Sequence, residues 1–324
     1  TLTDKFVKNS WFYCNARHVD GLDGAEAGFE FTDRKQKNKF TVSYKMMYRA
    51  DSSDLNYLVF GNEWTPGKFN NTVNFGYDHP YSYHKGKGDI RMNLRSSSIG
   101  SDYNYQYMNL CVVNKNDLGK ININTRFFAQ IGTGTNWAKE SMLFAAGENP
   151  EEMMDSKYTR SMGLFPTEWA DFGTDVNHFQ EGGGVGLRGY AGYYMPQEDW
   201  YGDVRKTYKG TTGYGFSTEI EFQELFGFIG KAMPRVNSIF HLDTYLFGDI
   251  GSINFNDPGE KLAMSDFRAD AGVGTALTIK RFPPLQTVKP LTIRFDMPLF
   301  LNSVPYVSQN YVQFRWVVGI SRAF

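Results

Sequence analysis

The chain has 324 residues, of which 41% are hydrophobic, 16% aromatic and 21% charged, with a formal net charge of -1. No run of about 18 apolar residues occurs, which excludes a membrane-spanning helix, and the balanced charge gives no general attraction to nucleic acid. The 33 glycines and the many aromatic residues favour strands and tight turns. The two cysteines, Cys14 and Cys111, fit neither a zinc nor a redox spacing.

The first 131 residues contain segments of about ten residues in which apolar and polar side chains alternate. This period of two is typical of transmembrane barrel strands, which turn one face to lipid and the other to the lumen. The clearest segments are 39–48 and 121–131, and weaker ones lie near 25–32, 54–64, 72–78, 89–97 and 103–113. The connections at 85–88 and 116–119 are short and contain Gly, Asn, Asp or Lys, so we expect hairpins.

Residues 135–213 interrupt this alternation. The segment contains several prolines and the glycine-rich run 182–189. It is too long for an ordinary turn, and loops of this length usually have a function. We therefore expect one long extracellular loop here.

Alternation returns in the last third of the chain. The predicted strands are 214–225, 239–253, 267–279, 291–301 and 311–324. In the last of them Phe314, Trp316 and Phe324 lie on the apolar register, whereas Gln313 and Arg315 lie on the other. This strand has no Pro and only Gly319 in its interior, which favours a stably closed barrel.

A water-soluble β-sandwich or a lipocalin-like barrel alternates in the same way, because its apolar face packs inward. Here the face opposite the apolar one is rich in Gly, Ser, Thr, Asn, Arg and Asp, which suits a polar lumen. The sequence therefore predicts an all-β fold, a transmembrane antiparallel β-barrel of about 14 to 16 strands with a long loop folded into its lumen.

Catalytic and cofactor motifs are lacking. Residues 184–189 match G-x-G-x-x-G, but neither a βαβ unit nor an amphipathic helix surrounds them. The five histidines have no paired spacing, and no G-x-S-x-G segment occurs. We expect a protein that is not an enzyme and has no catalytic residue, metal site or cofactor.

Three segments carry a family resemblance. The glycine-rich segment 182–190 ends in Arg188, Gly189 and Tyr190; a strand over 215–222 follows, and then Phe247 and Asp249 in the order Phe-x-Asp-x-Gly. In order and spacing, roughly 180–324 resembles the BamA-like bacterial surface-antigen superfamily. Its barrels carry an Arg-Gly-Phe or Arg-Gly-Tyr tip on a long extracellular loop and end in an aromatic residue.

The resemblance implies a contact between the loop and the lumen. Arg188, with Gly189 and Tyr190, would form the loop tip, Glu221 and Asp249 would be its acidic partners, and Phe247 would pack nearby. The residues themselves favour this contact, because alternation directs Glu219, Glu221 and Asp249 into the lumen, where unpaired carboxylates are costly. The alternative is that Arg188 is solvated on an external loop.

The resemblance also implies a place in the cell and a set of functions. Phe314, Trp316 and Phe324 would form a terminal assembly signal, and the protein would lie in the outer membrane of a Gram-negative bacterium, in contact with lipid. We expect residues 1–324 to be one barrel domain from a longer protein, with any periplasmic or enzymatic domain upstream of this chain. The barrel would anchor or support a fused domain or protein partners; alternatives are a protein insertase or translocase and a passive pore.

Overall fold

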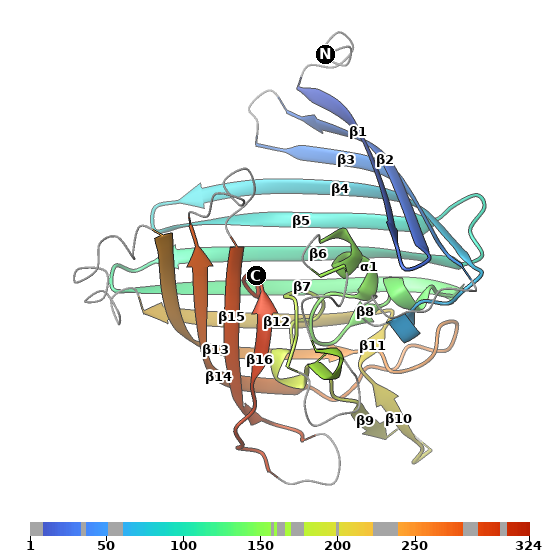
Figure 1. Cartoon of the computed structure of the whole chain (residues 1–324). Coiled ribbons are helices and arrows are strands. Elements are labelled where there is room, and N and C mark those ends of the chain that lie inside the picture. The colour runs from blue at the N-terminus through green and yellow to red at the C-terminus, as the bar shows by residue number, and fades with distance from the viewer. Residues whose placement is uncertain are drawn as a thin grey trace.

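The computed structural model describes residues 9–33, 37–50, 61–156, 159–160, 166–169, 178–198, 201–222, 239–280, 291–304 and 310–324. Twelve of the described strands form one antiparallel, strongly curved sheet (Figure 1). The sheet consists of β1 (Ser10–Val19), β2 (Leu22–Thr32), β3 (Lys39–Arg49), β4 (Phe69–Tyr83), β5 (Gly86–Ser97), β6 (Asn104–Asp117), β7 (Ile121–Asn136), β12 (Gly213–Phe222), β13 (Phe240–Ile253), β14 (Arg268–Ile279), β15 (Leu291–Leu301) and β16 (Val317–Ile320).

The strands lie in chain order, with β12 directly beside β7. The chain between them leaves and rejoins the sheet at neighbouring strands. Its short elements are η3 (Lys139–Ser141), β8 (Leu143–Phe144), α1 (Pro150–Asp155), η5 (Thr167–Trp169), η6 (Arg188–Tyr190), β9 (Met195–Glu198), β10 (Val204–Thr207) and β11 (Lys209–Gly210). Of these, α1 and β8 lie inside the curve of the sheet, whereas β9 and β10 project from the sheet (Figure 1). We call the described part of 137–212 the inner loop, and the space within the curve the lumen.

The two faces of the sheet differ as the alternation predicts. Met108, Ile131 and Phe216 are 45%, 65% and 45% exposed on the outward face, although all three are apolar. Their neighbours on the lumen face, such as Arg126 and Ser217, are buried and polar. The predicted all-β, antiparallel fold with a long loop packed inside it is confirmed.

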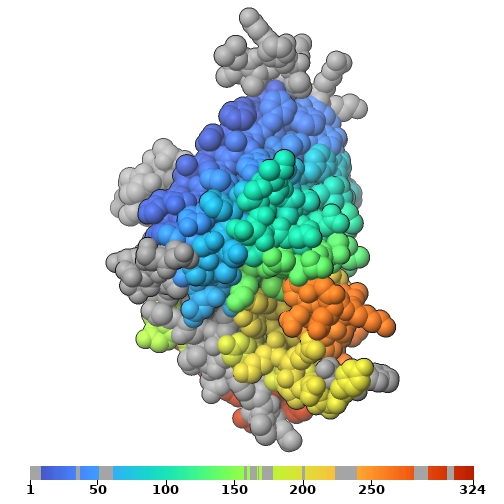
Figure 2. Space-filling model, turned by 90° about the vertical axis from the view of Figure 1, so that its right-hand side faces the viewer, coloured from blue at the N-terminus to red at the C-terminus, as the bar shows by residue number. Residues whose placement is uncertain are grey.

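The core lies between the inner loop and the sheet. Cys111 and Phe128 of β6 and β7 pack there against Val185 and Leu187 of the inner loop. At the end of the sheet where this loop emerges, the segments around β9 and β10 meet the segment that follows β13 (Figure 2). No helix in the described ranges is long and apolar enough to cross a bilayer.

The sheet does not close on itself within the described residues. Strand β1 pairs only with β2, and β16 pairs with β15, so the expected stable closure between the two ends is absent there. The predicted terminal strand over 311–324 is also shortened, because regular pairing covers only Val317–Ile320.

One further predicted strand and one predicted hairpin turn differ from the structure. Residues 61–63 of the predicted strand at 54–64 form the 3-10 turn η2 (Gly61–Glu63) instead of a strand, and 54–60 lie outside the described residues. Asn116 and Asp117 belong to β6, which narrows the second predicted hairpin turn to residues 118–120.

Candidate functional site

Arg188 joins the inner loop to the acidic part of the sheet. It lies in η6 and is only 2% exposed. Its Nε donates to Asp249 Oδ2 at 2.7 Å, and its Nη1 donates to Glu219 Oε1 at 2.9 Å. Burial opposes its charge, but Asp249, Glu219 and Asp296 hold the pKa of Arg188 well above its usual value. A planar guanidinium thus neutralises carboxylates from neighbouring strands.

The partners of Arg188 differ from the expected pair in one residue. The contact with Asp249 is present, but Glu219 takes the place assigned to Glu221. Glu221 faces the same lumen and instead pairs with Arg322 and accepts a hydrogen bond from Asn122. Alternation cannot choose between Glu219 and Glu221, because residues two apart on a strand share a face.

The rest of the loop tip is also fixed to the sheet. The backbone N–H of Gly189 donates to Asp270 Oδ2 at 3.0 Å, and the Tyr190 hydroxyl donates to Asn302 Oδ1 at 2.9 Å. The Arg188 guanidinium lies 4.2 Å from the ring centroid of Phe247, which allows a cation-π contact. A Cβ atom on Gly189 would lie 2.6 Å from Asp270 Cβ, so only glycine fits here.

The glycine-rich segment before Arg188 follows the lumen wall closely. Gly184 and Gly186 have φ of 55° and 99°, in the region that favours glycine. Arg126 of β7 donates to the carbonyl oxygens of Gly184 and Val185, at 2.6 and 3.3 Å. The G-x-G-x-x-G spacing therefore serves close packing of the loop on the sheet.

A second charged cluster, which sequence reasoning missed, fixes the inner loop to the first strands. Asn149 caps α1 with a capping box, and Glu151 in the first turn is 2% exposed. Glu151 Oε1 lies 2.7 Å from Lys45 Nζ, and its Oε2 accepts from Arg95 Nη1 at 2.6 Å. Burial alone would raise the pKa of Glu151, but Arg95 and Lys45 outweigh it and hold the pKa well below its usual range.

Asp155 and Glu140 complete this cluster. Asp155 pairs with Lys45 and with Arg17 of β1. Glu140 is 3% exposed and accepts from Asn70 Nδ2 at 2.9 Å. Burial raises the pKa of Glu140 to about 7, because hydrogen bonds only partly compensate the loss of water around the carboxylate.

The C-terminal residues turn into the lumen, which corrects the expected position of Phe324. Ser321 has a φ of 69°, which breaks the alternation after β16. Arg322 then pairs with Glu219, Glu221 and Asp243, and Phe324 packs against the core between inner loop and sheet. The carboxylates draw this end inward, so Phe324 does not continue the outward face.

The other predicted terminal residues lie at the edge of the sheet. Phe314 is 64% exposed. Trp316 stacks on His178 of the inner loop, with ring centroids 3.5 Å apart. Arg315 is buried and donates to the Asn310 carbonyl, whereas Gln313 is exposed.

The inner loop also pairs with the edge of β16. Phe179 forms a parallel bridge with Val318, and the N–H of Gln180 donates to the Val318 carbonyl at 2.8 Å. Arg294 of β15 reaches over Gly319 and donates to Gln180 Oε1 at 2.7 Å. This short contact covers the backbone groups of β16 that β15 leaves unpaired.

These clusters bind the inner loop to the sheet. The buried carboxylates are paired with arginine or lysine, or accept hydrogen bonds from backbone and amide groups. In the described ranges no group of three or more His, Cys, Asp or Glu is arranged to hold a metal ion.

No family model matches the sequence, and no curated protein shows significant similarity to it. Among solved structures, the chain is similar to a NanC porin (TM-score 0.30, 9% identity, 96% of this chain and 97% of that chain). It is also similar to the outer membrane protein OpdK from Pseudomonas aeruginosa, with a TM-score of 0.41, 9% identity, and coverage of 95% of this chain and 69% of that chain. A third similar structure is that of BamA from Haemophilus ducreyi lacking POTRA domains 1-3, with a TM-score of 0.47, 13% identity, and coverage of 98% of this chain and 60% of that chain. Porins and BamA both occur among them, so they do not single out the BamA-like superfamily.

We expect Arg188→Ala to destabilise the protein by about 3 to 5 kcal/mol, because buried carboxylates lose their partner. Protease resistance of the inner loop and heat-modifiable gel mobility should both fall. Arg205→Ala is the matched control, since Arg205 of the same loop pairs with Glu260 at an exposed site, where a cost below about 1 kcal/mol is expected. Equal stability of the Arg188→Ala variant and the parent would contradict the importance of this contact.

A second pair of variants separates Glu219 from Glu221 in the same assay. Glu219→Gln should release the inner loop to proteolysis more than Glu221→Gln does, because Glu219 alone of the two binds Arg188. Both variants remove a partner of Arg322, so that loss is common to the two. A larger effect of Glu221→Gln would show that Glu221, and not Glu219, is the main acidic partner of Arg188.

The raised pKa of Glu140 predicts a pH dependence. The folded protein binds this proton more tightly than the unfolded chain, so the stabilisation is complete below about pH 4.5 and lost as pH rises through about 7. Relative to the parent, Glu140→Gln should therefore gain stability over this range, by an amount on the order of 3 kcal/mol. Denaturant unfolding of both proteins at pH 4.5 and 8 measures it; a difference independent of pH would refute the prediction.

Proposed function

We propose that this chain is the barrel of a Gram-negative outer-membrane protein and acts as a membrane anchor or scaffold for a fused domain or protein partners. The observation that carries the proposal is the double attachment of the inner loop. Arg188 holds it to β12 and β13, and Glu151 holds it to β3 and β5. A scaffold needs a rigid wall, whereas a passive pore needs an open lumen.

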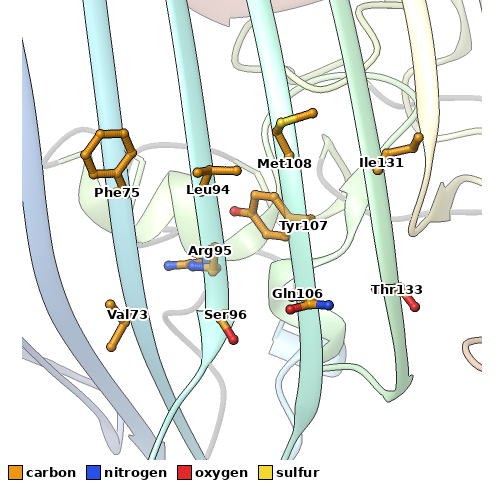
Figure 3. Close-up of a pocket in the computed structure, with 10 residues that line it drawn as sticks. All are labelled: Val73, Phe75, Leu94, Arg95, Ser96, Gln106, Tyr107, Met108, Ile131 and Thr133. Atoms are coloured by element: carbon orange, nitrogen blue, oxygen red, sulfur yellow. The ribbon is translucent and has the colours of Figure 1, made fainter.

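The outward face supports a position in lipid. Phe75, Leu94, Met108 and Ile131 form a row across β4 to β7, beside a hollow of about 420 Å³ in this face (Figure 3). A neighbouring row at the hollow contains Ser96, Gln106 and Thr133. Exposed apolar side chains on successive strands are costly in water and favourable in a bilayer.

The inner loop argues against a passive pore. Its segments bring buried charges to both sides of the lumen, where Glu151 pairs with Arg95 and Arg188 pairs with Asp249 of the wall. Removing such a loop would leave buried charges of both signs without partners, at a high cost in free energy. The loop therefore supports a closed lumen as the resting arrangement.

Fluorescence quenching in liposomes tests the position in lipid. A label at Met108→Cys should be quenched by brominated lipid, whereas a label at the adjacent Asn109→Cys should be protected, because strand neighbours face opposite sides. Both variants are made in a Cys14→Ser, Cys111→Ala background. Equal quenching at the two positions would refute the membrane barrel.

Planar-bilayer conductance of the same preparations then separates scaffold from pore. The parent should show little steady conductance, and the double variant Arg188→Ala, Glu151→Gln should show frequent open events. High conductance in the parent would favour the pore.

One observation favours a second candidate, a protein insertase or translocase. The edge of β16 is held by the short bridge to Phe179 instead of a full strand. An edge held by so few hydrogen bonds could be exchanged for a client strand. The anchor remains our first proposal because the buried ion pairs of the inner loop oppose its release.

A disulfide between Phe179→Cys and Val318→Cys distinguishes the two candidates. This disulfide should leave the function of an anchor unchanged. In an insertase it should stop the assembly of client proteins, and reduction of the disulfide should restore that assembly. A Cys pair at Ala25 and Met46, opposite each other on β2 and β3, provides a control crosslink away from this edge. Loss of client assembly with the first pair only would overturn the anchor proposal.

A further inference from the structure

A polar cavity lies at the end of the sheet opposite the emergence of the inner loop. It has a volume of about 690 Å³ and lies where β4 turns into β5 and β6 turns into β7. Lys85 and Lys87 line it from the first hairpin and Lys115 from β6, together with Asn122 and Asn124 of β7. None of these residues belongs to the attachment of the inner loop.

The sheet register concentrates positive charge in this cavity. Lys87 lies directly opposite Lys115, and Lys115 directly opposite the buried Asn124, so both lysines share the lumen face. Like charges opposite each other on neighbouring strands destabilise a sheet. Within the described residues neither lysine has a carboxylate within 4.0 Å, in contrast to Lys39 and Lys45, which face the same lumen.

The two carboxylates at the cavity are engaged elsewhere. Glu221 pairs with Arg322 and accepts from Asn122. Asp117 accepts a hydrogen bond from the N–H of Gly119 in the turn, which leaves its negative charge in place. Lys85, Lys87 and Lys115 outnumber the two carboxylates at the cavity, and among the described residues neither carboxylate forms an ion pair with Lys87 or Lys115.

Asn124 gives an independent indication of a ligand. This residue is 5% exposed and lines the cavity, and no described group forms a hydrogen bond with its side-chain amide, which is open to the cavity. An anion between Lys87 and Lys115 would accept from this amide and relieve the repulsion between the lysines.

We propose that this cavity binds a small soluble anion that carries a phosphate group. Ammonium groups and a side-chain amide are donors that suit phosphate oxygens. The cavity faces the lumen, on the opposite side of the sheet from the apolar face. Anion binding goes beyond an anchoring role and gives the short-turn end of the barrel a recognition function.

Isothermal titration of the detergent-solubilised full chain with inorganic phosphate, at constant ionic strength set by NaCl, tests the proposal. We expect saturable binding in the parent and a loss of at least about tenfold in affinity in Lys87→Gln, Lys115→Gln. Lys120→Gln is the matched control, because Lys120 lies exposed in the same β6–β7 turn outside the cavity lining. It should bind phosphate as the parent does.

Thermal unfolding at low salt makes the test independent of a folding defect. Without phosphate, the double lysine variant should be at least as stable as the parent, because the repulsion is gone; with phosphate, only the parent and Lys120→Gln should gain stability. No saturable binding in the parent would overturn the proposal. Equal affinity of the parent and the double variant, or an equal loss in Lys120→Gln, would do the same.

Discussion

The requirement that buried charges be paired governs how this molecule is put together. Arg188 brings a cation from the inner loop to the carboxylates of β12, β13 and β15, while Glu151 brings an anion to the basic groups of β3 and β5. The lumen wall is thus acidic on one side and basic on the other. Neither side is stable without the loop, because a buried charge that loses its partner costs several kcal/mol. The loop belongs to the fold as much as the strands do.

Much of this fold follows from the period of two in the sequence. Alternation identifies the outward and lumen faces of β12 and β13, because one register shift would turn every apolar side chain the wrong way. It also directs Glu219, Glu221 and Asp249 inward. Alternation does not determine which inward residue of a strand lies beside the tip of the inner loop. The choice between Glu219 and Glu221 as partner of Arg188 therefore depends on how far the inner loop extends along β12. That reach is a property of the whole loop and has no local signal.

Features that depend on single residues or on distant contacts escaped prediction. Glu151 lies in a helix of six residues, too short for a periodic pattern, and its partners lie more than 50 residues away. Strict alternation over 311–324 would place Arg322 on the register of Phe314, but the left-handed Ser321, which the pattern cannot foresee, turns it into the lumen. Gly319 shows in the sequence only as a glycine inside the last predicted strand. In the structure its lack of a side chain provides space for Arg294 to reach the inner loop. In each case a contact between residues far apart in the sequence determines the arrangement.

The inner loop also connects the lumen to the edge of the sheet. The segment that bridges Val318 through Phe179 continues within ten residues to Arg188, and Gln180 accepts from Arg294 between them. Arg294 in turn pairs with Asp296, which lies 3.8 Å from Arg188. Displacing the loop from the β16 edge would therefore disturb the same ionic network that holds Arg188. A few backbone hydrogen bonds at the edge are weak alone, but the network behind them makes their exchange costly. This coupling is the physical reason to favour an edge that stays covered at rest.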